Sequence, residues 1–81
     1  MQFDLMLNPG RFAWAVNVNV EDDSVRIGAL YLEPNVPDSN IRLESGNEAV
    51  DVVLPEEFLR QGKAQRAWNV ELPRFSQDQE L

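Results

Sequence analysis

The sequence predicts a mainly β domain (β-rich α+β) of five or six mostly antiparallel strands, folded as a small sandwich or curled sheet. Three observations predict it: hydrophobic residues recur with period two in several short runs, turn-forming residues separate these runs, and only the segment near residues 55–61 has the pattern of a helix. The 81 residues are too few for two hydrophobic cores. We therefore expect one domain over residues 1–75, followed by a disordered C-terminal tail at residues 76–81.

The first two strands show the clearest alternation. Residues 3–7 alternate and lead into Asn8-Pro9-Gly10, a combination typical of a tight turn. A fully extended strand from Arg11 to Glu21 would span roughly 35 Å at about 3.3 Å per residue, so we expect a bend, a bulge or a protruding end. Period two places five apolar side chains of this strand on one face: Phe12, Trp14, Val16, Val18 and Val20.

A third strand is expected after a hairpin loop at residues 21–24. The later part of residues 25–32 is apolar on both faces, which is typical of a strand that is central or covered on two sides. Residues 33–40 contain two prolines and form the longest expected loop.

A second hairpin and the last strand complete the expected sheet. Strands near residues 41–44 and 48–54 flank a Gly46-Asn47 turn, and the last strand covers residues 68–72. Between them, residues 55–61 are expected to form a helix of about two turns, because proline suits its first position and glutamates suit its positive end.

The absence of two residue types bears most directly on function. With no histidine and no cysteine, the chain lacks the usual proton shuttle near neutral pH, the commonest transition-metal ligand and the thiol nucleophile. Glu21-Asp22-Asp23 lacks the ligand spacing of a calcium loop, and the four glycines lie outside any phosphate-binding pattern. We expect no enzyme activity, no cofactor and no metal site.

The charge of the chain is acidic but uneven. The net charge of −7 disfavours direct binding to nucleic acid and to anionic membranes, and it would attract a basic or nucleic-acid-binding protein. Residues 58–74 reverse this sign, with four basic residues and one acidic residue. No signal-like N-terminus or long apolar stretch is present, so we expect a cytoplasmic protein, in the host cytoplasm if it is viral.

The candidate contact residues follow from these charges and from one aromatic residue. Trp14 and Trp68 lie in the apolar phase of expected strands and are therefore expected in the core. Seven other residues are the candidates for binding a partner: Glu21, Asp22, Asp23, Arg60, Lys63, Arg66 and Phe75.

Two functions from different classes stay open. The first is a small protein-binding module or inhibitor, of the kind that viruses and mobile elements encode, which acts through an acidic surface or a sheet edge; in one version its carboxylates imitate a DNA phosphate track. The second is an assembly subunit that forms a homo-oligomer through its edge strands.

Overall fold

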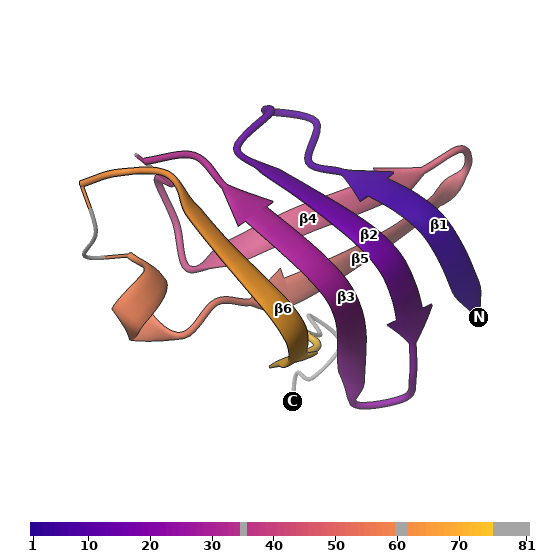
Figure 1. The fold of residues 1–81 in the computed structure, drawn as a ribbon. Coiled ribbons are helices and arrows are strands. Elements are labelled where there is room, and N and C mark those ends of the chain that lie inside the picture. The colour runs from indigo at the N-terminus through magenta and orange to yellow at the C-terminus, as the bar shows by residue number, and fades with distance from the viewer. Residues whose placement is uncertain (35, 60–61, 76–81) are drawn as a thin grey trace, which may run out of the picture.

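The computed structural model describes residues 1–34, 36–59 and 62–75, and it confirms the predicted fold class. Six strands form one antiparallel sheet in the order β5-β4-β1-β2-β3-β6 (Figure 1). The strands are β1 (Gln2–Leu7), β2 (Ala13–Val20), β3 (Ser24–Leu32), β4 (Asn40–Ser45), β5 (Glu48–Val53) and β6 (Gln65–Pro73).

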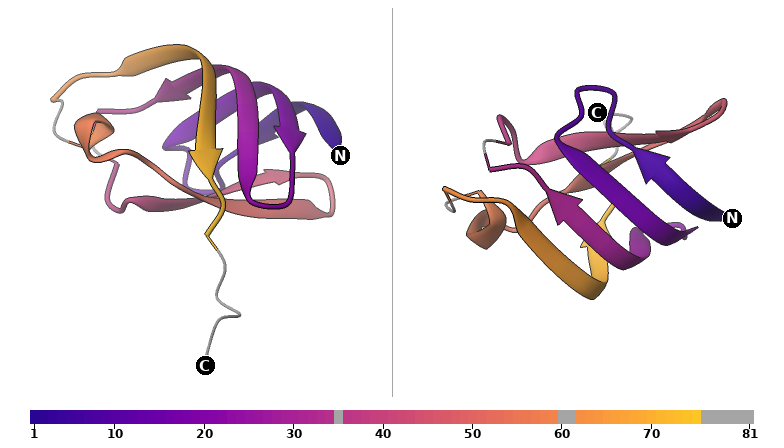
Figure 2. Two further views of the ribbon diagram at one scale, coloured as in Figure 1. Left: turned by 90° about the horizontal axis from the view of Figure 1, so that it is seen from below. Right: turned by 45° about the horizontal axis from the view of Figure 1, so that its top comes forward.

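The sheet curls into a half-barrel because its two parts are joined loosely. Strands β1 and β4 share only the register pair Leu7–Glu44, so the β4–β5 hairpin crosses one face of the other four strands (Figure 2). The two end strands meet at a single bridge between Val52 and Arg74, and the Phe75 amide donates a hydrogen bond to the Asp51 carbonyl at 2.9 Å. The half-barrel therefore closes at one point along its open side.

The core lies between the curled sheet and the crossing hairpin. Buried asparagine Asn8 fixes the first turn: its Nδ2 donates to the Arg42 carbonyl at 2.9 Å, and its Oδ1 accepts from the Phe12 amide at 3.2 Å. The buried hydrophobic residues come from all six strands and the segment after β5: Met6, Ala13, Ala15, Val18, Val25, Ile27, Leu30, Leu32, Ile41, Leu43, Val50, Val52, Leu54 and Leu72.

Strict alternation of buried and exposed side chains breaks at one level in four strands. The registers on either side align Asp4, Asn17, Gly28 and Asn69, and none of these four residues is paired in the ladders. Across this level the inward-facing residues are three positions apart rather than two. In each of the four strands, therefore, the inward-facing residues are even-numbered on one side of the level and odd-numbered on the other. The inward-facing pairs are Phe3 and Met6, Ala15 and Val18, Ile27 and Leu30, and Ala67 and Val70.

We call these four residues the switch level. It divides the four strands into a Trp14 half (residues 5–7, 13–16, 29–32 and 65–68) and a Val25 half (residues 2–3, 18–20, 25–27 and 70–72). Asn17 and Asn69 have φ values of 55° and 54°, in the left-handed region that asparagine tolerates better than most residues. Because each of these four strands has one extra residue at the switch level, the pairing register is the same in the Trp14 half and in the Val25 half.

The switch level corrects two expectations drawn from the sequence. Five apolar residues between positions 12 and 20 were expected on one face, but Trp14 lies on the outer face while Val18 is buried. Trp68 was expected in the core and is instead 64% exposed. Strand β3 is flanked on both sides, by β2 and β6, as its apolar later half predicts, yet no element within the described ranges covers the outer face of that half.

The predicted helix is shorter than expected. Among the described residues, only Glu56–Phe58 forms helical structure, as one turn of 3₁₀ helix with Pro55 before it and the Leu59 amide bonded to the Glu56 carbonyl. Residues 60 and 61, in the second half of the predicted helix, lie outside the described residues, as does the predicted tail at residues 76–81. A 3₁₀ turn is typical of short connections between strands.

Candidate functional site

The acidic candidates lie together in the loop between β2 and β3, and arginines contact them. Nη1 of Arg74 donates a hydrogen bond to the Glu21 carbonyl at 2.8 Å, and the Arg74 amide donates to the Asp23 carbonyl at 3.0 Å. Arg26 places its Nε 3.8 Å from the Glu21 carboxylate. The loop is therefore tied to the end of β6 through its backbone, and one of its three carboxylates, that of Glu21, is paired with an arginine.

The seven candidates do not form one site. Phe75 follows Arg74 and lies at the same end of the sheet as the acidic loop, whereas Lys63 and Arg66 lie near the start of β6 at the opposite end. The seven residue steps from Arg66 to Pro73 span about 23 Å along a strand. Arg60 lies outside the described residues.

The acidic loop also borders a hollow between β1 and the start of β5. This hollow of about 230 Å³ is lined by apolar residues at or next to β1, β2 and β5 and by Glu21, Asp22, Glu48 and Arg74. Within the ranges that the structure describes, no three Asp or Glu residues are close enough together to hold a metal ion. The sequence contains no histidine or cysteine to supply other ligands.

A different surface gathers most of the exposed apolar side chains. Register pairing aligns two adjacent rows on the outer face of β1, β2, β3 and β6, and we call their eight residues the outer aromatic surface. The first row is Leu5, Val16, Ala29 and Trp68, and the second is Leu7, Trp14, Tyr31 and Arg66.

The exposure of this surface is unusual for side chains of this kind. Leu5, Leu7 and Val16 are 47%, 41% and 40% exposed, and Trp68 is 64% exposed. Large apolar side chains that are exposed singly are normal, but these four lie in two adjacent rows. At the centre, the rings of Trp14 and Tyr31 pack edge to face with their centroids 5.1 Å apart.

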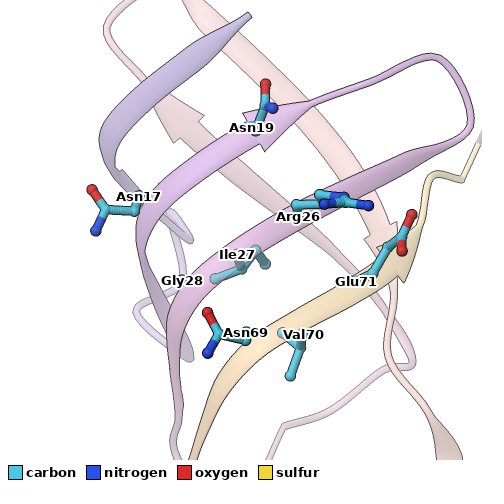
Figure 3. Close-up of a pocket in the computed structure, with 8 residues that line it drawn as sticks. All are labelled: Asn17, Asn19, Arg26, Ile27, Gly28, Asn69, Val70 and Glu71. Carbon is cyan, nitrogen blue, oxygen red and sulfur yellow. The ribbon is translucent and has the colours of Figure 1, made fainter.

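The switch level is the boundary of this surface. Beyond it, the next outward-facing row of the Val25 half is polar and consists of Gln2, Asn19, Arg26 and Glu71. A hollow of about 410 Å³ lies along the boundary, where Figure 3 shows Asn17 and Asn69 on either side of Gly28. The outer face is thus apolar on one side of the asparagines and polar on the other.

A second hollow adjoins the outer aromatic surface near β4. It has a volume of about 480 Å³ and is lined by Leu7 and Trp14 together with Arg11, Glu44 and Gly46 of the neighbouring turns and β4, among others. Glu44 lies opposite Leu7 in the register, so the carboxylate is at the margin of the apolar rows.

Comparisons with known proteins give no further information about this surface: no family model, no curated protein and no solved structure matches the chain. Among the described residues, no helix is long and apolar enough to cross a membrane. Sequence reasoning missed Leu5, Leu7, Val16 and Trp68 as surface residues. An asparagine within an apolar alternating run, at positions 17 and 69, is only a weak signal of positive φ, because Asn19 stands in the same run and is not among the residues with positive φ.

Proposed function

We propose that the protein is a non-catalytic protein-binding module that contacts its partner through the outer aromatic surface. One observation carries the proposal: four large apolar side chains, each at least 40% exposed, lie in adjacent rows of one sheet face and surround a packed Trp–Tyr pair. Exposed apolar patches with a polar border commonly mark sites of protein contact, and tryptophan, tyrosine and arginine are enriched there.

The cost of the exposed arrangement supports the proposal. Holding a non-glycine residue in the left-handed region costs about 1 kcal/mol or more, and the chain does so at both Asn17 and Asn69. Exposing Trp68 also forgoes the stabilisation that burial of a large apolar side chain provides, about 1.5–3 kcal/mol.

The geometry favours the face of the sheet over the two surfaces expected from the sequence. The acidic loop is contacted by Arg26 and Arg74, and the two end strands meet at the Val52–Arg74 bridge. The first contact pairs one of the three acids, and the second closes one point of the edge, so the apolar rows are the larger unpartnered feature. That the module is an inhibitor, that its partner is basic, and that it is viral stay predictions from the sequence.

The proposal is tested by placing a photo-crosslinking amino acid on the surface in the cell that produces the protein. At Leu7, on the margin of the surface, we expect covalent adducts with another protein chain, identical or different. At the exposed control position Glu57, in the 3₁₀ turn, we expect none. Adding Leu5→Glu should remove the adducts at Leu7. A folded protein that gives no adduct at Leu7 contradicts the proposal.

A further inference from the structure

We propose that the partner on the outer aromatic surface is a second copy of the chain, packed face to face about a two-fold axis that runs along β2. This inference rests on the proposed function, because it names the occupant of the same surface. Most soluble oligomers are homo-oligomers with such closed symmetry, in which one patch must be complementary to itself. Two properties of this patch meet that requirement, one of charge and one of shape.

The charge property is found in one row that crosses five strands. Pairing aligns Glu44 of β4 with Leu7, Trp14 and Tyr31 and ends at Arg66 of β6. Four strand spacings of about 4.8 Å separate the acid from the base by about 19 Å along the sheet. Neither charged side chain forms an ion pair or a side-chain hydrogen bond within the described part of the chain.

The symmetry axis decides whether these charges attract or repel. A two-fold axis along the strands reverses the row when a second copy is laid over it, so Glu44 of each copy lies on the same side of the contact as Arg66 of the other. Trp14, at the middle of the row, then lies over its own equivalent, within the apolar centre of the contact. An axis along the row would instead place acid over acid and base over base.

The shape property follows from the same reversal. Trp68 is the most exposed large residue of the surface and stands at its β6 side. The hollow lined by Leu7, Trp14, Glu44 and Gly46 lies at the opposite, β4 side. The reversal carries the Trp68 indole of each copy toward this hollow on the other. Aligned sheets cross at about 30°, so β2 of each copy lies about 15° from the axis. A side chain about 10 Å from the axis is then shifted by about 5 Å, which is less than the distance of about 6.6 Å between the two rows.

The size and charge of the patch set how strong the dimer should be. Two rows on four strands form a contact at or below the standard size of about 800 Å² per partner, so we expect a micromolar or weaker dissociation constant. Each copy also carries a net charge of −7, which opposes association at long range. Salt screens this repulsion, so raising the salt concentration from about 20 mM to about 200 mM should strengthen the dimer. The same change would weaken the binding of a basic partner, because salt also screens the attraction between opposite charges.

The test is sedimentation equilibrium of the purified chain from about 1 µM to about 1 mM, with charge-reversed variants. E44R and R66E each place like charges opposite one another, and each should weaken the dimer about tenfold or more. An equimolar mixture of the two variants restores opposite charges at both ends of the row and should form a heterodimer of wild-type affinity. The double variant E44R/R66E should dimerise as the wild type does. Should either reversal impair folding, the milder E44Q and R66Q replace it.

The outcomes separate this inference from the proposed function. A chain that stays monomeric to about 1 mM at both salt concentrations overturns the second copy as partner, and adducts at Leu7 with a different protein would then preserve the proposed function. A dimer that is indifferent to E44R and R66E, or a mixture of the two that fails to associate, overturns the two-fold arrangement. Absence of both dimer and adducts contradicts both proposals.

Discussion

Replacing Gly28 with alanine should destabilise the fold, because β2 packs closely against Gly28 at the middle of the switch level. A methyl group there would lie 3.0 Å from Asn17 Cβ and 3.3 Å from the Val16 carbonyl oxygen. Neither atom can move aside independently, because both belong to β2: the first is part of Asn17, which has positive φ, and the second is part of the residue before it. Overpacking of this kind costs about 1–3 kcal/mol.

The assay is thermal unfolding followed by circular dichroism. For a domain of this size, 1 kcal/mol corresponds to a change of about 4–8 °C in the melting temperature, so we expect Gly28→Ala to lower it by at least about 5 °C. Gly62→Ala is the matched control, because no atom lies within 4 Å of the added methyl group there. A Gly28→Ala variant that melts within about 2 °C of the wild type would refute the idea that close packing at the switch level requires glycine.

Three further experiments, with five substitutions in all, test the left-handed residue of β2, the buried asparagine and the exposed tryptophan. Asn17→Val should destabilise the protein by about 1–2 kcal/mol because a β-branched residue resists positive φ, whereas Asn17→Gly should be tolerated; equal urea midpoints for the two variants would contradict this. Asn8→Ala removes both side-chain hydrogen bonds of a buried residue and should cost about 2–3 kcal/mol in urea unfolding, and a loss below about 0.5 kcal/mol would be inconsistent with their role. Trp68→Ser should change the unfolding free energy of the monomer by less than about 1 kcal/mol, while Leu72→Ala should cost about 2–5 kcal/mol; a large loss in the first would mean that Trp68 serves the fold rather than a partner.

The elements of the fold could be predicted because local patterns encode them. Period two identified the strands, and turn residues placed the hairpin loop at residues 21–24 and the turn at Gly46-Asn47. The helix was overestimated, because proline and two glutamates suit the first turn of any helix and do not set its length. The contacts of the acidic loop could not be predicted, since Arg74 reaches Glu21 from 53 residues away.

The outer aromatic surface escaped prediction for a different reason. An alternating run of hydrophobic residues specifies that a strand has an apolar face. It does not reveal whether one residue within the run has positive φ. Val16 and Val18 are therefore equivalent in the sequence, although Val16 is exposed and Val18 is fully buried. Only the alignment of Asn17 with Gly28 and Asn69, which come from distant parts of the chain, makes the change of phase visible.

Because the switch level crosses four strands, no single strand can lose it alone. If β2 reverted to strict alternation, Trp14 and Val16 would turn toward the core while Ala13 and Ala15 turned outward, and the pairing with β1 and β3 would then bring opposite faces together. The pairing register is kept on both sides of the switch level because β1, β2, β3 and β6 all make the change of phase there. Single substitutions at the switch level should therefore lower stability without turning the Trp14 half inside out, so the outer aromatic surface persists as long as the sheet is folded.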